Sequence, residues 1–466
     1  MDAATPGRGW LLRLVLTFTF AQAAVSMARP AVSYRALALG ADERAVGVIT
    51  AVYALLPLLV AVPLGRRTDH GRCAPLLVAG VALIAGGCAL SGVAGSLPAM
   101  AAWSGVMGLG HLCFVIGAQS IVARRSAPDE RDRSFGHFTI GASLGQLVGP
   151  AAAGLVVSEH DGAMAATSAT ALLAAGGLAA FSYLSLWRLE HHPATASGAT
   201  RPARSRTKPA VRTPVRSALI TRGRTKPVAR TPVRSALNTR GRTKPAARAP
   251  VRSILATRGV AAGIFMSLAV LSATDILTAY LPVIGEDRGI APATVGLLLS
   301  LRAAATVACR LVMTPMIRRL GRTALMAGSC ALAGLLCAGL TVPTPVWALA
   351  VMLGVLGFCL GVGQPLSMTT VVQAAPAAAR STALALRLTG NRLGQVAAPA
   401  TAGLLAGLAG TAAPFALLGV LLLASAAVAA RPARKEPGPP RPEHADSPHP
   451  HGPPAPDPDD ETRATR

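Results

Sequence analysis

Apolar residues in this chain form stretches of about 20 positions, separated by short segments that contain charged residues, glycine or proline. A helix of about 20 residues spans the roughly 30 Å hydrocarbon core of a bilayer and satisfies its own backbone hydrogen bonds there. The pattern predicts twelve spanning helices, over residues 10–28, 46–64, 75–93, 98–122, 136–157, 165–187, 260–284, 291–313, 324–342, 346–372, 383–405 and 412–430. The composition of 52% hydrophobic and 14% charged residues agrees with an all-α membrane protein.

The first of these stretches has an alternative interpretation. Ala21-Gln22-Ala23 resembles a signal-peptidase site, so the stretch could be removed as a signal peptide. The order of the later spans favours a retained helix, because two sets of six are complete only with this one.

A polar insert separates the two sets of six. It contains an 18-residue unit three times, with copies that begin at Arg206, Arg224 and Arg242. Residues 188–258 hold eighteen Lys and Arg against one acid, Glu190, which is +17 of the net +25 of the chain. Frequent prolines and few apolar residues disfavour a helix or a core. We therefore predict four parts, which are an N-terminal six-helix bundle (1–187), a basic disordered linker (188–258), a C-terminal six-helix bundle (259–430) and a disordered tail (431–466).

Basic residues fall in alternate segments between the spans. These include Arg66 and Arg67, Arg124 and Arg125, the insert, and Arg318 and Arg319, whereas the opposite segments are short or of mixed charge. The positive-inside rule then predicts a multi-pass protein of the cell membrane, with both termini, the insert and the tail in the cytoplasm. The basic insert could contact anionic lipid headgroups, or it could be a duplicated linker without a role. Nucleic acid is not an expected partner, because the insert has no aromatic residues for base stacking.

The two halves resemble each other in sequence. Leu144-Gly145-Gln146 with Pro150 and Gly154 returns 249 positions later as Leu393-Gly394-Gln395 with Pro399 and Gly403, and Gly47 matches Gly296. Such a repeat predicts two pseudo-symmetric bundles with a binding site between them, an arrangement common among transporters.

The segment after the second span contains Gly65, Asp69, Gly71 and Arg72 in the order Gly-x-x-x-Asp-x-x-Gly-Arg. This motif resembles the cytoplasmic gate motif of the major facilitator superfamily, and we expect it in a short loop where Asp69 acts as a latch. The second half keeps Gly321-Arg322 but has Arg319 near the position of Asp69, so the latch is expected on one side only. A simple basic turn is the alternative.

The fifth span contains Gly136, Gly145, Gly149 and Pro150, and with Gly141 its glycines form one smooth helix face. This is similar to the fifth-helix motif of the proton-coupled drug antiporters of the superfamily. Two features depart from that branch, since Ala153-Gly154 replaces the closing glycine pair and Trp103-Ser104 stands where an intramembrane arginine is usual. Ordinary helix packing is the alternative.

Ionisable residues inside spans are costly and usually line a cavity. Asp275 is the one carboxylate deep within an apolar stretch, and we predict it as the proton carrier. The candidates for the substrate cavity are Gln22, Arg29, Arg302, Asn391, Arg392 and Gln364. Two alternatives stay open, namely a structural ion pair such as Asp275 with Arg302, and arginines at Arg29, Arg310 and Arg387 that extend toward water. For His111 and His137, satisfied packing or interface positions are the favoured interpretation.

The resemblance implies a secondary active transporter of a small organic molecule, most simply a monomer that exports its substrate in exchange for protons. An importer or facilitator of an organic anion is the alternative within transport, and a membrane-anchored binding or sensor protein that uses the insert is the alternative outside it. The sequence lacks a P-loop, a metal-ligand cluster and a nucleophile elbow, so we expect no enzyme activity, no cofactor and no bound metal.

Overall fold

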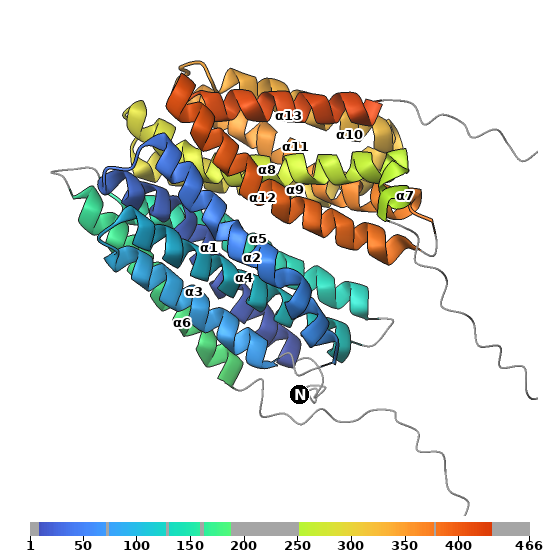
Figure 1. Cartoon of the computed structure of the whole chain (residues 1–466), viewed down its shortest axis with the longest axis horizontal. Helices are drawn as coiled ribbons and strands as arrows, with labels where there is room; N and C mark the ends of the chain where they lie inside the picture. The colour runs from blue at the N-terminus through green and yellow to red at the C-terminus, as the bar shows by residue number, and fades with distance from the viewer. Residues whose placement is uncertain are drawn as a thin grey trace, which may run out of the picture. The chain divides into compact units, whose positions relative to one another are not determined.

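The computed structural model describes residues 9–70, 74–126, 130–158, 163–187, 251–376 and 379–430. Within these ranges the secondary structure is helical, and Figure 1 shows the helices lying side by side. The helices are α1 (Gly9–Ala38), α2 (Glu43–His70), α3 (Ala74–Val93), α4 (Leu97–Arg125), α5 (Arg131–Val156), α6 (Met164–Trp187), α7 (Val251–Ala256), α8 (Arg258–Asp287), α9 (Pro292–Leu320), α10 (Arg322–Gly339), α11 (Val346–Ala374), α12 (Arg380–Ala409) and α13 (Ala413–Ala430).

The long helices form two bundles of six that are related by the internal repeat. Helices α1 and α8 begin at Gly9 and Arg258, 249 positions apart, and the same offset separates the starts of α4 and α11, of α5 and α12, and of α6 and α13. Eleven of the helices in the described ranges are long and apolar enough to cross a membrane. The remaining long helix, α12, has 30 residues but carries arginines within it. The predicted fold class, an all-α membrane protein with two pseudo-symmetric six-helix bundles, is confirmed.

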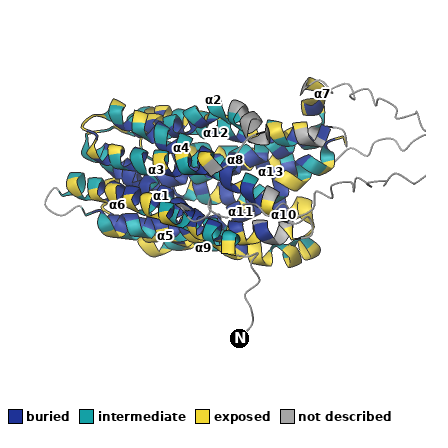
Figure 2. Cartoon of the chain, turned by 90° about the horizontal axis from the view of Figure 1, so that it is seen from below, coloured by how far each residue is buried: buried dark blue, intermediate teal, exposed yellow. Residues whose placement is uncertain are grey.

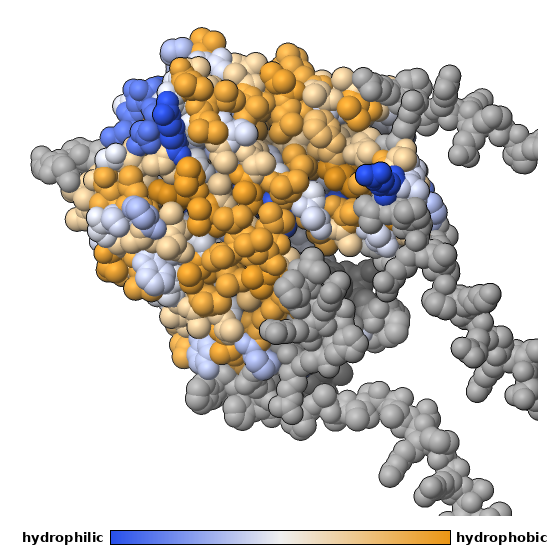
Figure 3. All heavy atoms as spheres, viewed as in Figure 1, coloured by the Kyte–Doolittle hydropathy of each residue, from blue (hydrophilic) through white to orange (hydrophobic). Residues whose placement is uncertain are grey.

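The surface has the polarity that a bilayer requires. Buried residues gather on the inward helix faces and exposed ones on the outer faces (Figure 2), and apolar residues cover much of the face seen in Figure 3. Large exposed side chains such as Leu155, Leu311 and Leu408, each more than 70% accessible, would be unfavourable in water but suit hydrocarbon.

Two boundaries differ from the sequence-based prediction. Helix α2 continues to His70, so Gly65 and Asp69 of the gate motif lie within a helix and not in a loop. Helix α7 lies inside the segment predicted as linker, where its buried Ile254 packs with Val260 and Val371. Ile254 is the buried residue of this short helix, and it gives α7 an apolar side chain to pack against the C-terminal bundle. The predicted disorder of residues 188–250 and of the tail lies outside the described residues.

Glycines join the two bundles at the ends of the helices that are remote from the chain termini. On one side, α2 meets α12 where Gly47 lies against Gly403 and the Pro399 carbonyl. On the other, α5 meets α9 where Gly154 lies against Gly296. A Cβ atom on Gly47, Gly154 or Gly296 would collide with backbone, and one on Gly403 would lie only 3.0 Å from the Gly47 Cα atom, so the close approach favours glycine. The pairs correspond under the 249-residue repeat, and they close this end of the molecule symmetrically.

Polar contacts strengthen the same end. The Ala151 amide, next to the proline of α5, donates to Ser300 Oγ on α9 at 3.0 Å. Tyr280 donates from its hydroxyl to the Glu43 carbonyl at 2.9 Å, and the Arg44 guanidinium donates to the Gly407 carbonyl at 2.9 Å. These three hydrogen bonds join the bundles at the closed end, and the site lies nearer the middle of the interface.

Candidate functional site

An ion pair joins the two bundles at the middle of their interface. Arg29 of α1 donates from Nη1 to Asp275 Oδ1 of α8 at 2.7 Å, and the side chains are 18% and 6% exposed. The pair predicted with Arg302 is therefore wrong in its partner, because α1 places Arg29 against the carboxylate, whereas the broader alternative of a structural ion pair at Asp275 stays open. The interpretation of Arg29 as a residue that extends toward water is also wrong, since its guanidinium points at a buried carboxylate.

The second oxygen of the carboxylate is bound from α12. Gln395 donates from Nε2 to Asp275 Oδ2 at 2.8 Å, and Arg392 donates from Nη1 to Gln395 Oε1 at 3.0 Å. Gln395 thus connects a second arginine to the same anion. One carboxylate is held from both bundles by a direct arginine and an indirect one.

A chain of hydrogen bonds extends from the ion pair into the N-terminal bundle. The Arg29 guanidinium lies 5.3 Å from the ring centre of Tyr53 on α2, a cation–π distance. The Tyr53 hydroxyl lies 2.8 Å from His111 Nδ1 on α4, and His111 Nε2 lies 3.2 Å from Gln22 Oε1 on α1. A His111 with its proton on Nε2 donates to the amide oxygen of Gln22 and accepts from the Tyr53 hydroxyl at Nδ1. The chain is complete with a neutral imidazole.

Several polar atoms around the ion pair have no partner within the described ranges. Arg302 of α9 is 9% exposed, interacts electrostatically with Arg29 and Asp275, and has a buried Nε without a hydrogen bond. Ser272 Oγ, one helical turn from Asp275, and Asn391 Oδ1, one turn from Gln395, are also buried and unpaired. Buried polar atoms are seldom left unpaired, so these three are candidates for contact with a bound solute.

The repeat makes the charge asymmetry of the site plain. Arg302 occupies the position in α9 that Tyr53 occupies in α2, and Asp275 occupies the position in α8 that Ser26 occupies in α1. Equivalent backbone positions therefore carry charge in the C-terminal bundle and neutral hydroxyl groups in the N-terminal one. With Arg29 and Arg392, the centre holds three arginines and one carboxylate, an excess of two positive charges.

Gln364, another predicted cavity residue, lies elsewhere. Its Oε1 accepts from Arg387 Nη2 at 2.8 Å and its Nε2 donates to the Ser267 carbonyl at 3.0 Å, which makes a separate cluster within the C-terminal bundle. Arg387 is 7% exposed and also donates to Ser367 Oγ at 3.3 Å, so the prediction that it extends toward water is wrong. Arg310 and His137, by contrast, are exposed.

The glycine face predicted on the fifth span is present in α5. Gly141, Gly145 and Gly149 lie against α1, where a Cβ on Gly145 would come within 2.6 Å of the Ala23 amide. Gly136 lies in open space. Because Gln22 and Arg29 are on α1, this tight contact fixes the helix that carries two residues of the site.

The gate motif is only partly described. Gly65 and Asp69 belong to α2, but their side-chain surroundings, together with Gly71 and Arg72, lie outside the described residues. The latch role of Asp69 remains a prediction.

Sequence reasoning missed Tyr53 and underrated His111 and Gln395. Tyrosine is scarce in this chain, with four in 466 residues, so a tyrosine in the middle of an apolar span was a usable signal. Gln395 shares a helix face with Asn391 and Arg392, but only the fold shows which residue its amide meets. Among the described residues no cluster of three metal-ligating side chains occurs, and the six described cysteines are free and buried.

A polar centre enclosed by two repeated six-helix bundles defines a multi-pass membrane transporter for small solutes. The family model for the Major Facilitator Superfamily matches residues 14–283 and 260–458, and the chain belongs to that family. It is a secondary transporter and not an enzyme.

Solved structures of the family share its fold. The chain is similar to the nucleoside transporter NupG, with 14% identity, a TM-score of 0.64, and coverage of 90% of this chain and 98% of that one. It is similar to a POT family transporter, with 15% identity, a TM-score of 0.66 and coverage of 90% and 94%. It is also similar to a bacterial homologue of the human lysosomal transporter Spinster, with 13% identity, a TM-score of 0.65, and coverage of 92% of this chain and 97% of that one. No curated protein matches the chain by sequence.

Proposed function

We propose that this transporter carries a small organic anion together with protons, and that Asp275 is the proton carrier. The observation that carries the proposal is the buried centre with three arginines and one carboxylate. A buried cation without a counter-ion is costly, so a site with two excess positive charges favours an anionic ligand. Arg302, whose Nε has no partner in the described ranges, is the arginine best placed to bind it.

The Arg29–Asp275 pair links the proton to the anion. While Asp275 is ionised, its carboxylate competes with a solute anion for Arg29. A proton on Asp275 removes that competitor and raises the positive potential of the centre, so proton and anion bind more tightly together than separately. A cation, in contrast, would compete with the proton. The same residues therefore favour cotransport of an anion over exchange of a cation.

The closed end of the molecule gives the proposal a direction. The glycine contacts shut the interface at the helix ends remote from the termini. With the termini in the cytoplasm, as the arginine distribution predicts, the interface is closed toward the outside, as an inward-facing state requires, and the solute would leave toward the cytoplasm. The bacterial Spinster homologue, whose structures are inward-facing, supports such a state for this fold.

Proton-coupled export is the second candidate. The observation that favours it is the glycine face of α5, which resembles the fifth-helix motif of drug antiporters and packs tightly against α1. The net positive charge of the centre disfavours cationic compounds as exported substrates. An anionic compound is compatible with either import or export. A membrane-anchored sensor that uses the insert has less support, because such a protein would not need a buried polar centre between its bundles.

Transport by the purified protein in proteoliposomes tests the proposal. We expect an inward proton gradient to drive accumulation of some members of a panel of small carboxylates and phosphates, and of no matched amines or neutral amides. A protein that transports only amines would contradict anion transport. A protein that moves anions only outward as protons enter would support export.

A further inference from the structure

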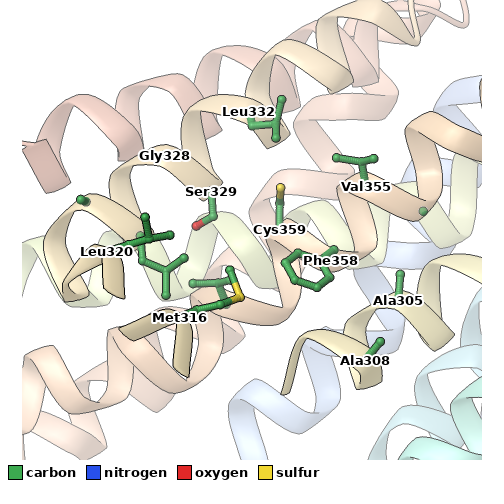
Figure 4. Close-up of a pocket in the computed structure, with 14 residues that line it drawn as sticks. Ala305, Ala308, Met316, Leu320, Gly328, Ser329, Leu332, Val355, Phe358 and Cys359 are labelled. Atoms are coloured by element: carbon green, nitrogen blue, oxygen red, sulfur yellow. The ribbon is translucent and has the colours of Figure 1, made fainter. Parts of the chain in front are cut away.

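A second hollow lies in the C-terminal bundle, apart from the polar centre. It has a volume of about 560 Å³ and lies between α9, α10 and α11, as Figure 4 shows. Its floor is formed by buried residues such as Leu325, Cys359 and Val362, whereas Leu320, Leu332 and Val355 at its rim are at least 37% exposed. None of its lining residues belongs to the polar centre. The hollow opens on the outer surface of the bundle, where the bilayer lies.

The lining offers almost no means of binding a polar group. Ser329 is its one hydroxyl side chain, and its Oγ already donates to the Met326 carbonyl at 3.1 Å. Cys359, whose thiol behaves as a small apolar group, and Met316 and Phe358 complete an apolar wall (Figure 4). The buried part of any occupant must therefore be hydrocarbon.

Positive charge lies beside one end of this hollow. Arg318 and Arg319 in the last turn of α9 and Arg322 at the start of α10 are exposed. Gly321, between Arg319 and Arg322, has φ +78°, which allows α9 to turn into α10 without a longer loop, so the three arginines lie within five positions of one helix junction. The neighbouring residues Leu320 and Ala324 line the hollow, so the arginines stand at its mouth.

We propose that this hollow binds one acyl chain of an anionic phospholipid, whose headgroup lies against Arg318, Arg319 and Arg322. Apolar walls suit the acyl chain, and basic residues beside a transmembrane pocket suit an anionic headgroup. The volume is within the roughly 300–1,000 Å³ of pockets that hold organic ligands. A helix from a second copy of the chain, about 10 Å wide and 30 Å long, is several times too large to enter. A polar transported solute would find no hydrogen-bond partner on the floor.

Photo-crosslinking tests the acyl chain. The full-length protein is reconstituted in phosphatidylcholine vesicles with a small fraction of phosphatidylglycerol that carries a diazirine near the middle of one acyl chain. We expect the label on peptides of α9, α10 and α11 that line the hollow. Gly328→Phe should reduce this labelling several-fold, because Gly328 lines the hollow and a side chain there meets open space. Gly177→Phe, at an exposed glycine of α6 that also faces open space, is the matched control and should not change it.

The headgroup is tested with a second lipid and a second variant. Phosphatidylcholine with the same diazirine chain should label the hollow several-fold less, and the triple variant Arg318→Gln, Arg319→Gln, Arg322→Gln should remove the difference between the lipids. Equal labelling by both lipids, or label spread evenly over the outer faces of both bundles, would overturn the proposal. So would an unlabelled hollow whose Gly328→Phe variant changes the oligomeric state, because that would assign the surface to a second copy of the chain.

Discussion

At the residue scale, the charged side chains of the buried centre differ in whether they have hydrogen-bond partners. Asp275 is bound by Arg29 at 2.7 Å and by Gln395 at 2.8 Å, while Arg302 lacks a hydrogen bond at Nε within the described residues. Removing one member of a bonded pair leaves an unpaired buried group, whereas removing an unpaired arginine leaves none. The four charged residues should thus differ in what their loss does.

Arg302→Gln tests this difference. We expect the variant to keep its abundance and melting temperature but to bind the anionic solute more weakly. A charged hydrogen bond is worth about 1.5–3 kcal/mol, which corresponds to a loss of roughly 10- to 150-fold in affinity. The measurement is solute binding to the purified protein.

Arg387→Gln is the control for that experiment. Arg387 donates to Gln364 and Ser367, away from the centre, so its loss should lower the melting temperature and leave solute affinity nearly unchanged. Equal solute affinity of the wild type and the Arg302→Gln variant would show that Arg302 does not bind the solute.

At the scale of elements, the sequence predicted the helices well and their partners less well. Span length and the positive loops follow from the bilayer, which acts on each segment separately, so the long helices could be found one by one. The partner of Asp275 could not, because Arg29 comes from the other half of the chain and only the packing of α1 on α8 brings it close. The glycine face of α5 could be predicted because it depends on spacing within one segment, but the sequence did not show that α1 packs against it.

The contact between α5 and α1 gives a prediction for an element. Gly145→Val would place a Cβ within 2.6 Å of the Ala23 backbone, and α5 must move away from α1. Overpacking of this kind costs about 1–3 kcal/mol, so we expect a lower melting temperature and lower abundance in the membrane. Gly136→Val makes the same chemical change on the same helix in open space and should leave both quantities unaltered. If the two variants melt alike, the close approach of these helices does not contribute to stability.

At the scale of the whole molecule, two bundles move solute and a basic insert connects them in the sequence. The insert has three similar copies and little apolar sequence with which to dock on a bundle. We predict that a chain with one copy in place of three transports solute at the wild-type rate per molecule. Flux and surface abundance are measured together in cells. A loss of flux at equal abundance would give the insert a part in the transport cycle.

Topology also belongs to this scale. The arginine distribution predicts that residues 188–258 face the cytoplasm, and the inward-facing interpretation depends on it. A reporter that is active only in the cytoplasm, fused near Arg222, should be active, and one that requires the other side of the membrane should be silent. The reverse pattern would turn the closed end toward the cytoplasm and invert the transport cycle.

Asp275→Asn in proteoliposomes tests the central claim most directly, once an anionic solute has been found. The asparagine keeps the shape of the side chain but can neither pair with Arg29 as an anion nor take up a proton. We predict that the variant still exchanges solute across the membrane down its own gradient and no longer accumulates solute when a proton gradient is imposed. Its melting temperature should be compared with that of the double variant Arg29→Gln, Asp275→Asn, since recovery there would reveal the cost of an unpaired Arg29. Proton-driven accumulation by a well-folded Asp275→Asn protein would contradict the account.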